Sequence, residues 1–138
     1  MYPTEIVAPM KAEVTENGFK ELLTPEDVDN ALEKPGTALL FINSVCGCSA
    51  GTARPGVVMA VKNAAKVPDQ VLTSFAGYDT AAVQQARTYL LPYPPSSPCI
   101  ALLKDGQVVH IIERHNIEGR PAQMIAANLM QAFETYCN

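Results

Sequence analysis

The chain has 138 residues, of which 48% are hydrophobic and 17% charged, and its formal net charge is −4. This size and composition are typical of a globular protein, so we expect residues 1–138 to form a single domain. The acidic balance argues against nucleic acid as a partner, because nucleic-acid binding needs a basic surface, and against an anionic membrane. Residues 1–10 lack the basic segment and apolar run of a signal peptide, and we expect a cytosolic protein.

The first quarter of the chain predicts two helices with a short strand between them. Residues 4–17 carry apolar side chains at helical spacing, and Pro9 is expected to start or bend this helix. Residues 19–22 fit a short edge strand. Thr24 and Pro25 then form a helix start, as the cap and the first helical residue.

The middle of the chain predicts strands and helices in alternation. Residues 37–45 form an apolar run without alternation, which is typical of a strand buried on both faces. Residues 49–66 predict a helix, which Pro55 should kink or shorten. Residues 71–75 predict a second inner strand, and Asp79 should cap the helix that follows.

The last third of the chain predicts an irregular segment, a hairpin and a closing helix. These are a proline-rich loop at 91–98, strands at 99–104 and 107–112, and a helix at 121–136. Asp105 and Gly106 between the two strands are a strong hairpin signal. Parallel crossovers followed by an antiparallel hairpin imply an α/β fold, a mixed sheet with helices on both faces. This arrangement is thioredoxin-like.

The strongest functional motif is Cys46-Gly47-Cys48, placed where the buried strand ends and a helix begins. Ligand and catalytic sites gather at such positions in α/β sheets. A helix N-terminus favours thiolate over thiol and typically lowers a cysteine pKa from ~8.5 to ~3.5–7.5. We therefore expect Cys46 to be the nucleophile and Cys48 the resolving thiol. Gly47 should help to close a small disulfide ring, because glycine adopts backbone angles that other residues avoid.

Two further features support thiol–disulfide chemistry by analogy with thioredoxin-like folds, and a third position departs from that analogy. Ser97 and Pro98 stand just before a strand, where a cis-proline lies against the reactive cysteine and the backbone before it binds substrate. Pro55 follows the motif at the spacing of the thioredoxin helix kink. Leu40 occupies the place of the buried acid of thioredoxins, so proton transfer must use water or a more distant group.

The remaining candidate residues each have a structural alternative. Arg54 is a candidate contact for an anionic thiol substrate, against the alternative of an exposed arginine on the helix surface. Cys99 is a candidate auxiliary thiol, although a buried inert cysteine is the favoured alternative. Cys137 is expected to be frayed or lightly packed. His110 and His115 fit structural or solvated roles as well as a catalytic one.

The sequence resembles the bacilliredoxin family along nearly its whole length. The motifs that carry the resemblance are Asn-Ser-Val-Cys-Gly-Cys at 43–48, Ala-Arg-Pro at 53–55, Phe-Ala-Gly at 75–77, Ser-Ser-Pro at 96–98, Ala-Leu-Leu-Lys at 101–104, Arg-His at 114–115 and Ile-Glu-Gly at 117–119. The resemblance implies reduction of mixed disulfides between protein cysteines and bacillithiol, a low-molecular-weight thiol, with no bound cofactor. S-thiolated proteins and this thiol would be the partners. Cys46 would take up the bacillithiol, and Cys48 or a second bacillithiol would release it. Cys99 departs from the family pattern, in which serine is usual.

Other functions remain as alternatives at this stage. A general disulfide reductase or isomerase would use the same motif. A soft-metal module is the alternative from another class, because a Cys-x-Cys pair binds Zn²⁺ or Cu(I), with Cys99, Cys137, His110 or His115 completing the site. No second close-set ligand pair is present in the sequence to support it.

Overall fold

The apolar run in the middle of the chain forms the central strand of the sheet. This strand, β2 (Thr37–Asn43), is buried along its whole length in a computed structural model that describes residues 2–138. It pairs in parallel with β3 (Gln70–Phe75) and antiparallel with β4 (Cys99–Lys104). The five-stranded sheet has the order β1-β3-β2-β4-β5, with β1 (Lys20–Glu21) and β5 (Gln107–Ile112) at its edges. The mixed α/β sheet expected from the sequence is confirmed.

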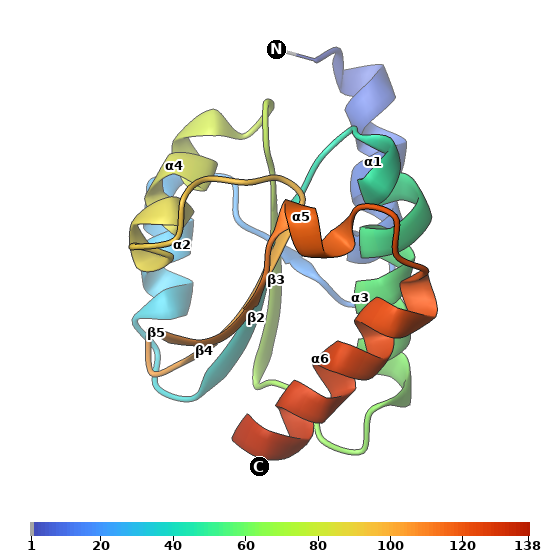
Figure 1. Ribbon diagram of the computed structural model, residues 1–138. Helices are drawn as coiled ribbons and strands as arrows, with labels where there is room; N and C mark the ends of the chain where they lie inside the picture. Colours follow the sequence, from blue (N-terminus) through green and yellow to red (C-terminus); the bar gives the residue numbers. More distant parts are fainter. Residues whose placement is uncertain (1) are drawn as a thin grey trace.

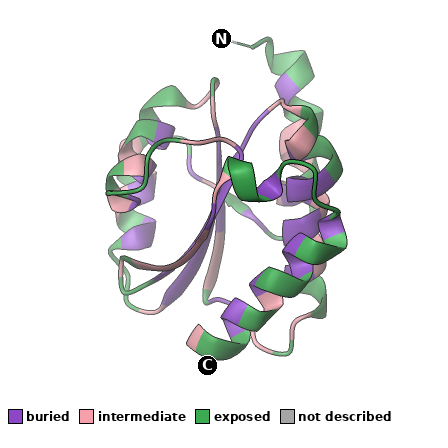
Figure 2. Cartoon of the chain, viewed as in Figure 1, coloured by how far each residue is buried: buried purple, intermediate pink, exposed green. Residues whose placement is uncertain are grey.

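Helices cover both faces of this sheet (Figure 1). α2 (Pro25–Leu32) and α4 (Thr80–Tyr89) lie on one face. The other face carries α1 (Thr4–Thr15), α3 (Arg54–Asn63) and α6 (Ala122–Tyr136). Each helix turns its buried residues toward the sheet and its exposed residues outward (Figure 2). Within residues 2–138, no helix is both long and apolar enough to cross a membrane.

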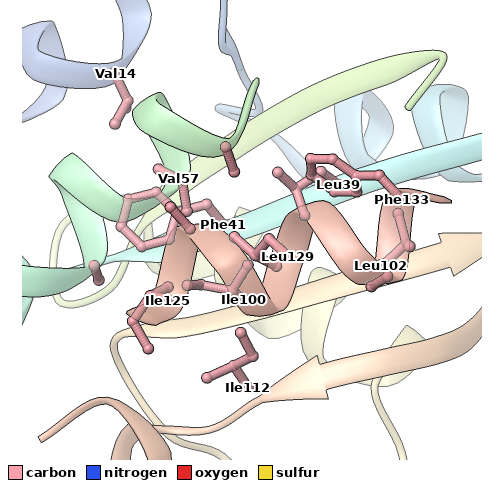
Figure 3. Packing of buried hydrophobic residues seen from close by; sticks show 14 of the residues in the cluster. Val14, Leu39, Phe41, Val57, Ile100, Leu102, Ile112, Ile125, Leu129 and Phe133 are labelled. Carbon is pink, nitrogen blue, oxygen red and sulfur yellow. The ribbon is translucent and has the colours of Figure 1, made fainter. Parts of the chain in front are cut away.

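The larger hydrophobic cluster fixes α3 and α6 against the sheet (Figure 3). Phe41 of β2 lies at its centre, with Val57 from α3 and Leu129 from α6 packed around it. Burial of each such side chain contributes about 1.5–3 kcal/mol. Cys137 also belongs to this cluster and is only 4% exposed. The frayed position expected for Cys137 is therefore wrong, because the end of α6 packs against the sheet.

Local signals in the sequence account for most element ends. The Thr24 hydroxyl accepts a hydrogen bond from the Asp27 N–H at 3.1 Å, and the Asp27 carboxylate accepts one from the Thr24 N–H at 3.2 Å. This capping box begins α2 as predicted. At the hairpin, Asp105 and Gly106 have φ values of 52° and 79°, which suit the right-handed twist of the two strands.

Three local expectations differ from the structure. Pro9 lies inside α1, so of its two expected roles, helix start or bend, the start is wrong. Asp79 precedes α4, but its carboxylate forms no capping hydrogen bond and instead pairs with Lys11 Nζ at 2.9 Å. A short helix that was not predicted, α5 (Arg114–Ile117), follows β5. Its only local signal is the reciprocal bonding of Glu113 and Asn116, an unusual pair of capping residues.

Candidate active site

The two cysteines of the motif are joined in the turn that follows β2. Cys46 and Cys48 form a disulfide with a Cα–Cα distance of 5.5 Å, so their spacing permits the expected bridge. Cys48 packs partly against the larger hydrophobic cluster, whereas Cys46 does not belong to it. Both residues are half-buried, and Gly47 between them is exposed.

Asn43, the last residue of β2, holds the two ends of this turn together. Its side-chain oxygen accepts hydrogen bonds from the Ser44 N–H at 2.8 Å and from the Ser49 hydroxyl at 3.0 Å. Its amide nitrogen donates to the carbonyl of Met10 in α1 at 3.2 Å. A buried amide with these partners fixes the turn on the strand before it and the helix beside it.

The helix after the motif begins irregularly. A π-helical turn, η1 (Ser49–Ala53), precedes α3, and Pro55 stands in the first turn of α3. Proline lacks the N–H that an α-helical turn before it would need, so the regular helix is shortened as predicted. The Cys46 carbonyl accepts hydrogen bonds from the N–H groups of Ser49 and Ala50, at 3.0 and 3.2 Å. The helical segment therefore starts on the first cysteine.

A surface hollow of about 410 Å³ opens beside the disulfide, and we call it the disulfide hollow. Its lining residues are Cys46, Gly47, Cys48, Thr52, Arg114, Glu118, Gly119 and Arg120. The Thr52 hydroxyl donates to the Arg120 carbonyl at 2.7 Å and so joins η1 to the segment after α5. In Figure 1, α5 lies at the end of the sheet from which β2 leads into the motif.

Arg114 connects α5 to the proline loop. Its Nη1 donates to the Ser97 carbonyl at 3.3 Å, and its Nε donates to Glu118 at 2.7 Å. The Ser97–Pro98 peptide bond is cis, as the thioredoxin-like arrangement predicts. Arg114, Glu118 and Arg120 are thus additional site residues, beyond those expected from the sequence. The pair of Arg114 and Glu118 is a local contact between residues four apart. The contacts of Arg114 with Ser97 and of Arg120 with Thr52 join segments that are distant in the sequence, and no local pattern predicts them.

Gly47 does not need the backbone freedom of glycine in this structure. Its φ is outside the positive range, unlike that of Gly119. An added Cβ at Gly47 would meet no atom within 4 Å. The expectation that glycine relieves the backbone here is wrong for the disulfide form. The distinctive property of Gly47 is that no other atom fills the space that a side chain at this position would occupy.

Arg54 lies below the surface and does not line the disulfide hollow. Its side chain is 1% exposed and its Nη1 pairs with the carboxylate of Glu13 in α1. Among the described residues, its Nε and Nη2 have no hydrogen-bond partner. The alternative of an exposed arginine on the helix surface is therefore wrong. The Arg54 side chain is also too deeply buried in this structure to contact a ligand in the hollow.

Cys99 also lies apart from the disulfide. It is 2% exposed and packs in the cluster under α2 and α4, on the face of the sheet opposite α3. Burial raises the pKa of the Cys99 thiol to about 11, and the nearby charge of Glu113 acts in the same direction. This placement fits the buried inert thiol favoured in the sequence analysis and gives no support to an auxiliary role.

The other candidate ligands are dispersed. His110 Nε2 lies 2.6 Å from the Asn128 side-chain oxygen, and His115 is exposed on α5. Cys137 follows α6 and contacts Thr37, the first residue of β2, whereas the motif follows the last residue of that strand. Across residues 2–138, no group of three or more His, Cys, Asp or Glu side chains is arranged to hold a metal ion. Nothing in the site favours the soft-metal alternative.

Comparisons with known proteins agree with this geometry. A family model described as "Disulphide isomerase" matches residues 2–137. A bacilliredoxin of Cytophaga hutchinsonii is 57% identical over 134 residues, covering 97% of this chain and 98% of the relative. A bacilliredoxin of Salinibacter ruber is 51% identical over 138 residues, covering 99% of this chain and 81% of the relative.

Solved structures show the same fold at low sequence identity. A mutant thioredoxin from Halobacterium salinarum superposes with a TM-score of 0.58 at 14% identity, covering 88% of this chain and 93% of that protein. The thioredoxin of Aeropyrum pernix gives a TM-score of 0.56 at 18% identity, covering 80% and 84%. The expected thioredoxin-like fold is thus confirmed. Together with the disulfide at Cys46 and Cys48, these matches show that the chain belongs to the bacilliredoxin family of thiol–disulfide oxidoreductases.

Proposed function

We propose that this protein reduces mixed disulfides between protein cysteines and bacillithiol, with Cys46 as nucleophile and Cys48 as resolving thiol. The observation that carries the proposal is the position of the disulfide in the wall of an open hollow. A small thiol fits a hollow of about 410 Å³, and both cysteines line it. We place the reaction in the cytosol, where low-molecular-weight thiols are kept reduced.

The reaction proceeds by two exchanges. The Cys46 thiolate attacks the bacillithiol sulfur of the mixed disulfide, and the electron pair of the broken bond leaves on the repaired protein cysteine. The Cys48 thiolate then attacks Cys46 Sγ and expels bacillithiol as a thiolate. The product of this second exchange is the Cys46–Cys48 disulfide present in the structure. A second bacillithiol is the alternative to Cys48 in the resolving step.

The geometry divides the roles of the two cysteines in this proposal. Cys48 packs partly against the hydrophobic cluster, which holds its sulfur close to the protein, and Cys46 lies outside that cluster. The two hydrogen bonds that the Asn43 side-chain oxygen accepts from Ser44 and Ser49 fix the ends of the turn. The helical segment that begins on the Cys46 carbonyl supplies positive potential, which favours the thiolate after reduction.

The test is intact mass spectrometry of the reduced protein after incubation with a bacillithiolated model protein, with a glutathionylated protein in parallel. The wild type should release the substrate thiol and form its internal disulfide. Cys48→Ser should accumulate a bacillithiol adduct on Cys46, and Cys46→Ser should release nothing. Cys137→Ala, which changes a distant buried thiol, serves as the control and should behave as the wild type. Substrate release by Cys46→Ser at the wild-type rate would contradict the proposal.

A disulfide isomerase is the second candidate, favoured by the description of the matching family model. An isomerase must rearrange incorrect disulfides of a folding protein without net oxidation or reduction. Recovery of activity from a ribonuclease with scrambled disulfides measures this directly. Rapid recovery, with bacillithiolated protein left unchanged, would favour isomerisation over the proposed reduction.

A further inference from the structure

The disulfide hollow carries a positive charge on a protein that is acidic overall. Among its lining residues, two arginines stand against one glutamate, which leaves a formal charge of +1, whereas the whole chain carries −4. The other lining residues, including both disulfide cysteines, are uncharged. The charge is therefore concentrated where a second thiol must enter to exchange with Cys46.

Neither arginine is fully committed to a partner within the protein. Arg114 pairs with Glu118 at 2.7 Å, but the two side chains are 47% and 55% exposed. An ion pair this open contributes little and exchanges readily for another carboxylate. Arg120 Nη1 donates to the Met124 sulfur at 3.8 Å, and a thioether sulfur is a weak acceptor. Both guanidinium groups thus keep donors for an incoming anion.

We propose that Arg114 and Arg120 form an anion-binding site that recognises a carboxylate of the low-molecular-weight thiol exchanging with Cys46. This inference rests on the proposed function and names the chemical class of its small thiol. Guanidinium groups bind carboxylates through paired N–H donors, which gives orientation as well as attraction. Glu118 opposes the site, because its carboxylate occupies Arg114 and repels a second anion.

The oxidised protein offers a direct reaction for testing charge recognition. A small thiolate attacks Cys46 Sγ, a new sulfur–sulfur bond forms, and the electron pair of the Cys46–Cys48 bond leaves on Cys48. A second small thiolate then attacks the sulfur of the bound small thiol. It releases the oxidised small disulfide and leaves Cys46 as a thiolate. Two equivalents of small thiol therefore supply the two electrons that reduce the protein.

The experiment compares small thiols that differ in charge. Acid-quenched mass spectrometry gives the rate at which 3-mercaptopropionate, 2-mercaptoethanol and cysteamine open the Cys46–Cys48 disulfide. Each rate is divided by the rate of the same thiol with the neutral disulfide 4,4′-dithiodipyridine, which removes differences in intrinsic reactivity. We expect the anionic thiol to be preferred over the neutral one, and the neutral one over the cationic one. The preference should be roughly two- to fivefold per arginine, as for an exposed ion pair, and should fall at high salt.

Variants of the hollow give expectations of opposite sign. Arg120→Gln and Arg114→Gln should each weaken the preference, and the double variant should abolish it. Glu118→Gln should strengthen it, because it removes the competing carboxylate. Arg114→Lys keeps the charge but loses the paired donors and the contact with Ser97, so its preference should lie between those of the wild type and Arg114→Gln. Lys34→Gln removes an exposed charge on another part of the chain and is the control.

Two results would overturn the inference. One is a wild-type protein without charge preference. The other is a double variant in which all three rates fall by the same factor, since that indicates an effect of the arginines on the protein cysteines alone. The assay contains no bacillithiolated protein, so its outcome is separate from that of the proposed function. Charge preference without removal of bacillithiol from proteins would refute only the proposed function, and the reverse result would refute only the anion site.

Discussion

The hydroxyl of Ser49 donates a hydrogen bond to the side-chain oxygen of Asn43 at 3.0 Å, across the turn that holds both reactive cysteines. The same oxygen accepts the N–H of Ser44, so one buried amide binds both ends of the turn. None of the atoms in this clamp belongs to the disulfide. It should therefore keep the two thiols close after reduction, which favours attack of Cys48 on Cys46 over escape of the mixed disulfide.

Replacement of Asn43 should weaken both the fold and disulfide closure. Asn43→Ala leaves the Ser44 N–H and the Ser49 hydroxyl unpaired, and we expect a loss of about 1–3 kcal/mol in the free energy of unfolding. Urea unfolding of the reduced protein measures this loss. Equilibration with dithiothreitol should also show a less stable Cys46–Cys48 disulfide. Ser49→Ala removes one donor and leaves Asn43 in place, so it should cost only about 0.5–1.5 kcal/mol. Equal losses in the two variants would contradict a central role for Asn43.

The sequence was sufficient to predict features that depend on neighbouring residues. The apolar run that becomes β2 and the hairpin at Asp105 are encoded locally, and both are present as predicted. The Cys46-Gly47-Cys48 motif marks its own position for the same reason. Side-chain partners were predicted poorly, because they depend on segments brought together only by folding. Arg54 is buried by α1, and Arg114 reaches Ser97 from a helix of one turn, and neither contact has a local pattern.

The buried pair of Arg54 and Glu13 should respond asymmetrically to substitution. Glu13→Ala leaves a guanidinium that is 1% exposed without its carboxylate. We expect a loss of about 3 kcal/mol, at the low end for a broken buried pair because Glu13 itself is 49% exposed. Arg54→Met replaces the charge by an apolar side chain of similar length and should be close to neutral. Chemical denaturation measures both values. In the double variant, the cost of losing Glu13 should largely disappear, and full additivity of the two changes would contradict the pairing.

Cys99 should make the folded protein less stable in alkaline solution. Burial raises its pKa to about 11, whereas an unfolded cysteine has a pKa of about 8.5. Between these values the folded protein retains a proton that the unfolded chain has lost. The free energy of unfolding therefore falls as pH rises through this window, by up to about 3 kcal/mol, and is unaffected below it.

The variant Cys99→Ala isolates this effect. Measurements between pH 8 and pH 10.5 are made under a reducing agent in a Cys46→Ser and Cys48→Ser background, which removes exchange with the Cys46–Cys48 disulfide and keeps Cys99 and Cys137 as thiols. The free energy of unfolding of the protein with Cys99, minus that of the protein without it, should fall steadily as pH rises. Loss of packing adds only a constant offset. Tyr89, whose pKa is raised to about 12, is present in both proteins and cancels from the difference. A difference independent of pH would show that the Cys99 pKa is ordinary.

Gly47 should matter for the approach of partners and not for folding. A Cβ at this position meets no atom within 4 Å, so we expect Gly47→Ala to change the free energy of unfolding by less than about 0.5 kcal/mol. The added methyl group would nevertheless lie on an exposed residue between the two cysteines that lines the disulfide hollow, where we expect a protein substrate to make contact. A clash of about 1 kcal/mol in that complex slows reduction of a protein mixed disulfide roughly fivefold. Attack by 2-mercaptoethanol, which needs little space, should slow much less.

Gly51→Ala is the matched control for this prediction. Gly51 is also exposed, with no atom within 4 Å of an added Cβ, so the change should leave both rates unchanged. Equal slowing of the two reactions by Gly47→Ala would contradict this expectation. It would mean that the glycine affects the reactivity of the two cysteines and not the docking of a protein chain.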